Sequence, residues 1–376
     1  MAEGPRAEAA AWLGLPVVPP ASVMSRVGRV RQRLQRSTQS GPPFVVVVEH
    51  LVGIWDPIVL GMLCRHDIAE AVVAGPADAG GIAARLDAGI EVDALHRILR
   101  YASMRGFVSI DRAGRFRANK VTEALTADHP GSARPWVEFL SGRSTLRIFE
   151  EVDEALFGRE PCRAAHGTDF FTHVNDHSPA DGDAFNGAMR QGSHVQGLLL
   201  ADAIEFGSMR RVVDVGGGTG ELAKILVRHH PSLEVTVLDL PSVVASGEAA
   251  AADAPGADRI TWTGGDFFTW VPAGADAYTL LAILHDWSDA DASRILANVA
   301  TAMGPTGRCF VVDATVDERR PQALSAATDL LMLLLTEGGR ERTAPEWERL
   351  VTGAGLSIAS HRLLATGFSL YELTTS

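Results

Sequence analysis

The sequence predicts an α/β fold with a mostly parallel sheet of seven strands in its C-terminal half and a mainly helical region before it. From residue 211 onward, short apolar strands alternate with helical stretches, which is typical of a parallel sheet with right-handed crossovers. The last two strands, 356–361 and 367–373, are separated by only a few residues and must therefore pair antiparallel at one edge. The expected inner strands are 211–215, 235–239, 260–263, 277–283 and 309–313.

Composition excludes several classes of protein. A chain of 376 residues with 46% hydrophobic residues is large enough for two or three folded domains and is not wholly disordered. Cys64, Cys162 and Cys309 lie far apart, which argues against a disulfide framework or a zinc module and favours a cytoplasmic protein. The net charge of −12 argues against a general nucleic-acid binder.

The chain divides into four expected regions. Residues 1–43, rich in Ala, Pro, Gly and Ser, are expected to form a loosely ordered arm. Residues 44–125 show helical apolar spacing followed by a short hairpin at 107–118, which indicates a winged-helix-like unit. Because the chain is acidic, dimerisation is a better use of this unit than DNA binding. Residues 126–205 are a helical linker expected to lie over a substrate pocket, and 206–376 form the ligand-binding domain.

The most apolar stretch, residues 44–63, is interrupted by Glu49, His50 and Asp56. It is too short and too charged to span a bilayer on this basis, so we expect a buried helix in a soluble protein with no membrane partner.

The sharpest local signal is the glycine-rich segment VVDVGGGTGE at 212–221, where an apolar strand runs through a turn into a helix. Gly216, Gly218 and Gly220 would let the backbone approach a ligand without an intervening Cβ. Nineteen residues after Gly220, the next strand ends at Asp239, whose carboxylate suits the two hydroxyls of a ribose.

Two details favour S-adenosylmethionine over a dinucleotide. The run is GxGxG, and Glu221 stands where a dinucleotide site needs its last glycine. Asp214 precedes the turn, where its charge would favour an ammonium or sulfonium group and disfavour a pyrophosphate. A third acid, Asp266, ends the third strand near the expected adenine, and three acids at adjacent strand ends fit a cationic nucleoside.

The motifs together resemble those of the class I S-adenosylmethionine-dependent O-methyltransferases, in particular the plant caffeate-type and bacterial polyketide-tailoring enzymes. The matching segments, in chain order, are FNGAM at 185–189, VVDVGGGTG at 212–220, LDLP at 238–241, GDFF at 265–268, LHDWSD at 284–289 and GGRERT at 338–343. The resemblance implies a Rossmann-like seven-stranded sheet, a homodimer formed through the N-terminal domain, and methyl transfer to a hydroxyl of a phenolic or polyketide-like small molecule.

His285 is the candidate general base. It follows the fourth strand at the edge of the sheet where ligands of such folds bind, and an imidazole can take the proton of a phenol during methyl transfer. The resemblance places the catalytic base at this histidine and an orienting acid at Glu341. Asp313 stands where the family often has glutamate, so its shorter side chain leaves open a second interpretation as a turn-capping acid at the end of a strand.

Further binding residues follow from the resemblance and from position. Ser193, Leu240 and Phe267 are expected near the cofactor. Met189, Met332 and Phe171 are expected near the substrate, with ordinary core packing as the alternative for each. Plant members have a lysine where this chain has Leu281, which predicts a more apolar adenine pocket. No metal is expected: His173 and His177 are four apart, but no third ligand lies nearby.

Three other functions remain open at this point. A relative could keep the fold and cofactor but hydroxylate or decarboxylate its substrate, or methylate carbon or nitrogen; the presence of His285 favours O-methylation. A DNA-binding regulator could use the winged unit and sense S-adenosylmethionine. A nicotinamide dehydrogenase is the third alternative, which titration with NAD would test.

Overall fold

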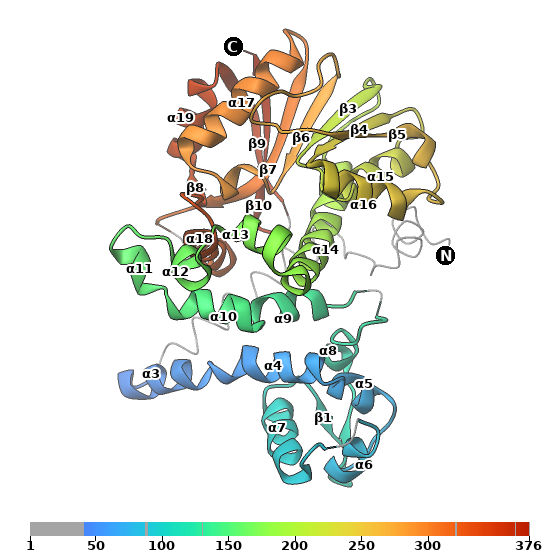
Figure 1. The fold of residues 1–376 in the computed structure, drawn as a ribbon, viewed down its shortest axis with the longest axis vertical. Helices are drawn as coiled ribbons and strands as arrows, with labels where there is room; N and C mark the ends of the chain where they lie inside the picture. The colour runs from blue at the N-terminus through green and yellow to red at the C-terminus, as the bar shows by residue number, and fades with distance from the viewer. Residues whose placement is uncertain (1–40, 87–88, 130, 320–321, 365, 376) are drawn as a thin grey trace. The chain divides into compact units, whose positions relative to one another are not determined.

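The computed structural model describes residues 41–375 apart from 87–88, 130, 320–321 and 365 (Figure 1). Two compact units are present. One comprises the described residues up to Arg147 together with Val174–Ala188, and the other comprises Ile148–His173 together with the chain from Met189 onward. The arm expected at 1–43 falls almost entirely outside the described residues.

The first unit consists of short helices and one hairpin. Its hairpin pairs β1 (Ser109–Ile110) with β2 (Phe116–Arg117) antiparallel, as the spacing predicts. Leu63, Leu95 and Leu99 lie in its apolar core. The helices of this part of the chain are α3 (Pro43–Val52), α4 (Trp55–Arg65), α5 (Ile68–Val73), α6 (Ala79–Ala83), α7 (Val92–Met104), α8 (Lys120–Glu123), α9 (Arg134–Leu140) and α10 (Arg143–Glu150), the last of which continues past the end of the unit at Arg147.

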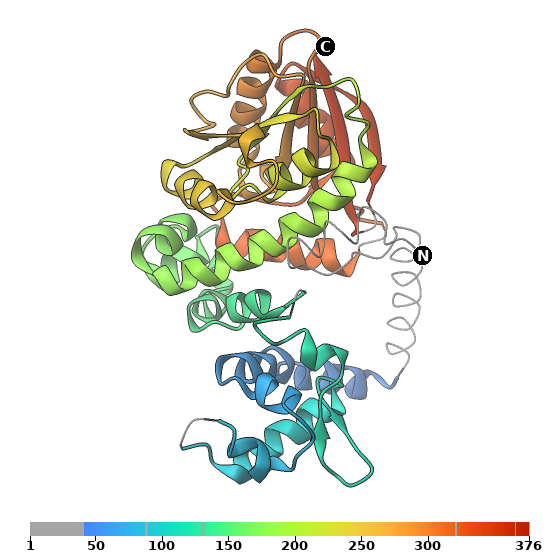
Figure 2. The same ribbon diagram turned by 90° about the vertical axis from the view of Figure 1, so that its right-hand side faces the viewer.

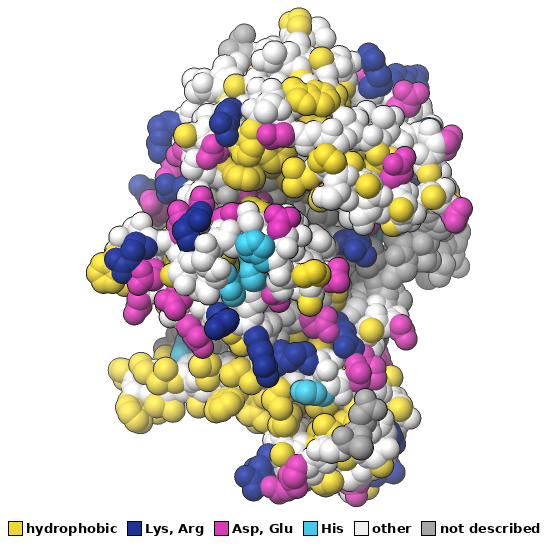
Figure 3. Space-filling view, in the orientation of Figure 1, with side chains coloured by type: hydrophobic (Ala, Val, Ile, Leu, Met, Phe, Trp, Pro, Cys, Tyr) yellow, Lys and Arg dark blue, Asp and Glu magenta, His cyan; other side chains and the backbone are white. Residues whose placement is uncertain are grey.

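The prediction that residues 44–63 form one buried helix is wrong for the first half of the segment, whereas the second half contributes Val59 and Leu63 to the core. The segment forms α3 and α4, and no residue of α3 is buried. Figure 3 shows its side chains as a continuous hydrophobic surface over α3 and the start of α4. By length and composition alone, the stretch Pro43–Arg65 is also long and apolar enough to cross a membrane. Its most apolar 18 residues have a mean hydropathy of 1.7, and 11% of them are buried. A single stretch of this kind does not establish a membrane segment.

The second unit contains an eight-stranded mixed sheet with the order β5-β4-β3-β6-β7-β10-β9 and a short β8 paired to β7. The five strands from β5 to β7 in this order are parallel, and β10 pairs antiparallel with both β7 and β9. All seven expected strands form, and β8 is an addition that the sequence did not indicate. The bounds are β3 (Arg211–Val215), β4 (Glu234–Asp239), β5 (Ile260–Gly264), β6 (Ala277–Leu281), β7 (Arg308–Val316), β8 (Arg342–Thr343), β9 (Leu356–Leu363) and β10 (Phe368–Thr375).

Helices cover both faces of this sheet (Figures 1 and 2). Ser288 accepts a hydrogen bond from the backbone N–H of Asp291, and Thr343 forms a full capping box with Glu346, so side chains cap the starts of α17 and α19. The helices are α11 (Asp153–Leu156), α12 (Pro161–His166), α13 (Phe170–Thr172), a π-helical turn (His173–His177), α14 (Pro179–Ala203), which spans both units, α15 (Glu221–His229), α16 (Pro241–Ala251), α17 (Asp289–Met303), α18 (Ala323–Leu335) and α19 (Ala344–Gly353).

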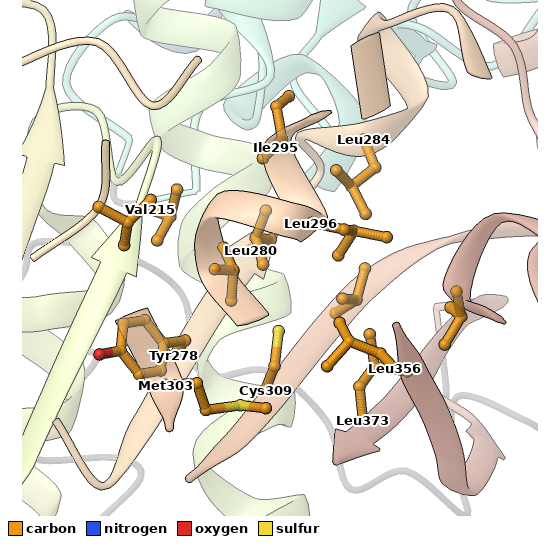
Figure 4. Packing of buried hydrophobic residues seen from close by; sticks show 14 of the residues in the cluster. Val215, Tyr278, Leu280, Leu284, Ile295, Leu296, Met303, Cys309, Leu356 and Leu373 are labelled. Atoms are coloured by element: carbon orange, nitrogen blue, oxygen red, sulfur yellow. The ribbon is translucent and has the colours of Figure 1, made fainter. Parts of the chain in front are cut away.

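The core of the second unit fixes the ends of the strands. Figure 4 shows Val215, Leu280 and Leu296 among the buried side chains that pack together between β3, β6 and α17. Every residue of β6 is buried, as expected for a central parallel strand covered on both faces. The loops that follow these strands therefore start from rigidly packed positions.

Candidate active site

The turn after β3 requires glycine at alternate positions. Gly216, Gly218 and Gly220 have φ values of +71°, +57° and +77°, a left-handed conformation that other residues rarely adopt. A Cβ at Gly218 would have no atom within 4 Å, whereas a Cβ at Gly220 would lie 2.4 Å from the ring of Trp262. The turn is thus tightly packed against Trp262 and open at Gly218.

The carboxylate of Asp239 fixes this turn from the end of β4. One of its oxygens accepts a hydrogen bond from the Gly218 N–H at 2.8 Å, and the other accepts one from the Leu240 N–H at 2.7 Å. Burial raises the pKa of Asp239, and the two hydrogen bonds oppose that rise. Each carboxylate oxygen retains a lone pair that can accept a hydroxyl group.

Asp214 and Asp266, the other two acids expected at strand ends, have different surroundings. Asp266 is exposed and accepts a hydrogen bond from the Phe268 N–H at 2.8 Å. Asp214 is buried beneath the turn, where Thr279 donates a hydrogen bond to it at 2.8 Å. Burial raises the pKa of Asp214 to about 7, and a Cβ at Gly217 would lie 2.6 Å from its carboxylate. Asp214 therefore supports the turn from within the sheet.

His285 lies in a short 3₁₀ turn, Leu284–Asp286, directly after β6. Between the strand and this turn, Ala282 adopts φ +55°, a left-handed conformation that is strained for a residue with a Cβ. The Ala282 N–H donates to the carbonyl of Val312 at 2.8 Å, so β7 holds the kink. The chain thus leaves the sheet sharply, and only 7% of His285 is exposed.

Three carboxylates surround the imidazole of His285. Its Nδ1 lies 2.9 Å from Oε1 of Glu341, which is a hydrogen bond, and 3.8 Å from Oδ1 of Asp313, which is not. Its Nε2 lies 3.6 Å from Oδ1 of Asp286. Because a carboxylate only accepts, Nδ1 carries the hydrogen of this bond, and the neutral imidazole has Nε2 free to accept a proton.

Asp313 lies inside β7 rather than at its end, since the strand continues to Val316. The alternative that it caps a turn at the end of a strand is therefore wrong. Its side chain is fully buried, and neither carboxylate oxygen has a hydrogen-bond partner among the described residues. Because its Oδ1 lies 3.8 Å from Nδ1 of His285, too far for a hydrogen bond, Asp313 acts on the imidazole through its charge.

The carboxylates determine the proton affinity of the imidazole. Burial alone would lower the pKa of His285, but the charges of Asp313 and Asp286 and the hydrogen bond that the ring donates to Glu341 outweigh it and raise the pKa to about 10. Burial also raises the pKa of Asp313 to about 7 and that of Asp286 to about 6, while the charge of His285 opposes both rises.

An aromatic cluster adjoins this turn. The ring of Phe171 stacks on Trp287 with centroids 5.8 Å apart and an angle of 18° between the planes. Phe268 and Phe267 meet Trp287 edge-on, at 4.7 Å and 6.0 Å. The cluster joins the loop after β5 to the turn that carries His285, and it places Phe171, expected at the substrate, against the indole ring.

The remaining predicted binding residues lie on α14, on α18, at the start of α16 and at the end of β6. Ser193 and Met189 are half-buried on α14, Met332 is buried in α18, and Leu240 is exposed at the start of α16. Leu281 is buried at the end of β6, in line with the apolar lining expected there. Across the described part of the chain, no group of three or more His, Cys, Asp or Glu side chains could hold a metal ion.

Sequence reasoning missed Thr279, the partner of Asp214. Its signal was a threonine in the strand AYTLL, because a polar side chain in a fully buried strand must find a hydrogen-bond partner.

Comparison with known proteins agrees with this geometry. Residues 149–357 match the O-methyltransferase domain family. The chain is 31% identical over 310 residues to the mitomycin biosynthesis 6-O-methyltransferase of Streptomyces lavendulae, with 82% of this chain and 87% of that protein covered. It is 30% identical over 341 residues to the aclacinomycin 10-hydroxylase of Streptomyces purpurascens, with 88% and 90% covered.

A solved structure of an O-methyltransferase from neocarzinostatin biosynthesis, in complex with S-adenosylmethionine and 2-hydroxy-5-methyl naphthoic acid, has the same fold. Its TM-score is 0.73 at 29% identity, with 85% of this chain and 96% of that chain covered.

Proposed function

We propose that this chain, which belongs to the S-adenosylmethionine-dependent O-methyltransferase family, methylates a phenolic hydroxyl of a small molecule with His285 as its general base. The observation that carries the proposal is the buried hydrogen bond of 2.9 Å between Nδ1 of His285 and Glu341, which leaves Nε2 as the proton acceptor.

The residues present fit the cofactor. Gly218 leaves its surroundings open, and Asp239 keeps lone pairs for the ribose hydroxyls after its two backbone hydrogen bonds. Asp266 and Phe267 lie on the adjacent loop for the adenine, with Ser193 and Leu240 as further contacts. When bound, S-adenosylmethionine supplies a methyl group on a sulfonium sulfur. Asp214 contributes by holding the turn in place rather than by direct contact.

The chain's own part in the reaction is to take and hold a proton. Nε2 of His285 takes the proton of the acceptor hydroxyl while Glu341 keeps the ring in one tautomer and orientation. Asp313 stabilises the imidazolium through its charge at 3.8 Å. General-base catalysis of this kind contributes about 10²- to 10⁴-fold.

Substitution of the base tests this mechanism. H285A and H285Q should bind S-adenosylhomocysteine as the parent protein does, by calorimetry, and should turn over at least about 100-fold more slowly. The matched control is His361→Ala, a histidine on β9 that contacts Ser369 and stacks on Tyr371. Unchanged turnover in the His285 variants would remove the general-base role and leave alignment as the whole mechanism.

We infer an aromatic acceptor, because Met189, Met332 and Phe171 offer apolar and aromatic contacts and a relative of known structure binds a hydroxylated naphthoic acid. The similarity to a hydroxylase makes oxygen insertion the second candidate reaction. Mass spectrometry of hydroxylated naphthoates and benzoates incubated with the protein distinguishes the two. A product with one more methyl group, formed together with S-adenosylhomocysteine, supports O-methylation, whereas a product with one more oxygen contradicts it.

We propose that residues 44–125 form a winged-helix-like dimerisation domain and that the protein is a cytoplasmic homodimer. In the same proposal, residues 126–205 contribute to the substrate pocket and residues 206–376 form the catalytic domain. Phe44, Val47, Leu51 and Trp55 recur at helical spacing on α3 and α4, each more than half exposed. An apolar surface of this kind is rarely left in water by a soluble monomer.

A second copy of this chain is the occupant we propose for that surface. Light scattering after size exclusion should give a dimer for the parent protein and a monomer for F44E/L51E. Met104→Glu, an exposed apolar side chain outside this surface, is the control. A monomeric parent protein, or one that partitions onto lipid vesicles, would contradict the proposal.

A further inference from the structure

We infer that Arg342 is a positioning residue that holds the turn carrying His285 in its reactive geometry. Its side chain is fully buried, and its guanidinium donates hydrogen bonds to the carbonyls of Leu284 and Trp287, each at 2.7 Å. These two carbonyls lie at either end of the segment that contains His285. The third hydrogen bond goes to Asp289 at 2.8 Å, in the first turn of α17.

The residues beside Arg342 act on the same turn. The Arg340 N–H donates to the carbonyl of His285 at 2.8 Å, and Glu341 accepts the hydrogen of its ring at 2.9 Å. Gly339 packs so closely that a Cβ there would lie 2.6 Å from the His285 carbonyl oxygen. The segment GGRERT therefore fixes both the backbone and the ring of His285, and Arg342 is the part of it that spans the whole turn.

Arginine is required here for its shape as well as its charge. The planar guanidinium carries several N–H groups at fixed angles and can reach two carbonyls and a carboxylate together, which the single ammonium of lysine cannot do in the same geometry. A cation buried this deeply is tolerated only when such acceptors surround it. The guanidinium also lies 5.7 Å from the ring of Trp347, a cation–π contact that fixes its plane.

Two consequences for the reaction follow. Without the guanidinium, the carbonyls of Leu284 and Trp287 lose their buried donors, so the turn can move; a displacement of about 1 Å at a reacting group can cost about 100-fold in rate. The positive charge of Arg342 also opposes the rise that burial causes in the pKa of Asp313, the acid beside the imidazole. This inference rests on the proposed role of His285 as the base.

Two substitutions test the inference. R342K keeps the positive charge but loses the planar set of N–H donors, and R342M loses both. We expect kcat to fall at least about tenfold in R342K and about 100-fold in R342M, while the affinity for S-adenosylhomocysteine changes by less than about threefold. In R342M alone, the pH below which kcat declines should move upward, because removing a positive charge raises the proton affinity of the neighbouring acids and imidazole.

The control is Arg308→Met at the start of β7, where the guanidinium pairs with Glu372 and lies 5.1 Å from the ring of Phe310. It should lower the melting temperature and leave kcat unchanged. If the Arg342 variants lose stability as R308M does but keep kcat, the positioning role is wrong. R342K remains informative if R342M does not fold. If H285A also keeps its turnover, the failure lies in the proposed base and not in Arg342.

Discussion

Replacing Glu341 with glutamine should slow turnover by roughly 10- to 150-fold. The bond from Nδ1 of His285 to Glu341 is short, buried and charge-assisted once the ring gains a proton, and such bonds contribute about 1.5–3 kcal/mol. Each 1.36 kcal/mol of lost transition-state stabilisation is a factor of about ten in rate. Glutamine keeps the size of the side chain and an oxygen that can accept, so the loss reports the charge of the carboxylate.

Replacing Asp313 with asparagine should have a different effect. Asp313 makes no hydrogen bond to the ring, but its charge is the largest contribution that raises the pKa of His285. Since the ring must be unprotonated to accept a proton, kcat should decline as the pH falls through the pKa of the reactive complex. Removing the negative charge of Asp313, which raises the pKa of His285, lowers that pKa. D313N should therefore move the decline to lower pH by more than E341Q does, with a smaller loss of kcat at the plateau.

The assay is kcat at saturating S-adenosylmethionine and acceptor from about pH 6 to about pH 10, which spans the ordinary and raised values for His285. Glu372→Gln is the control, since this acid on β10 pairs with Arg308 at the start of β7, five residues before Asp313. The reasoning is refuted if the decline moves to higher pH in D313N, or if D313N lowers the plateau more than E341Q.

Three further predictions follow from the surrounding structure. Gly220→Ala should weaken S-adenosylhomocysteine binding by at least about tenfold in calorimetry, because its Cβ meets Trp262 at 2.4 Å, whereas Gly274→Ala, with a similar φ of +81° and open space, should not. Asp214→Asn should be more stable than the parent protein near pH 8 and lose that advantage near pH 4 in denaturant titrations. The pKa of Asp214 is about 7 in the folded protein and about 4 in the unfolded chain. Ionisation of Asp214 therefore destabilises the fold progressively as the pH rises from about 4 to about 7. Phe171→Ala should raise the KM for the acceptor about 2- to 10-fold through the lost stacking, and an unchanged KM would place Phe171 outside the pocket.

Seven of the eight strands of the sheet were predictable because each of them has a strong local signal. The runs at 211–215 and 277–283 are apolar and end in glycine or in a polar turn, and general rules of α/β folds place Asp239 and His285 at the carboxyl ends of parallel strands. The hairpin at 107–118 had an equally local signal. The eighth strand, two residues long, carries no pattern of its own and forms only because Thr315 and Val316 extend β7 beside it.

The surroundings of the acids were not predictable in the same way. Asp214 and Thr279 are 65 residues apart, and Arg342 reaches Leu284 over 58 residues, distances at which spacing in the sequence gives no information on contact. The exposure of α3 was missed for a related reason. An apolar helix such as Pro43–Val52 has the same composition whether its own chain or another molecule covers it.

The charges around His285 also bear on the class of acceptor. With its pKa raised to about 10, the imidazole is protonated at neutral pH, so the reactive complex forms with the loss of one proton and pairs an imidazolium with the anion of the acceptor. A phenol, with a pKa of about 10, reaches that state readily. An aliphatic hydroxyl, with a pKa near that of water at about 15.7, would need about 8 kcal/mol more. The carboxylates that raise the proton affinity of His285 lower the cost of this proton transfer for any hydroxyl, and the acidity of the acceptor sets the cost that remains. A phenol is therefore the acceptor for which this buried acid cluster leaves the smaller cost.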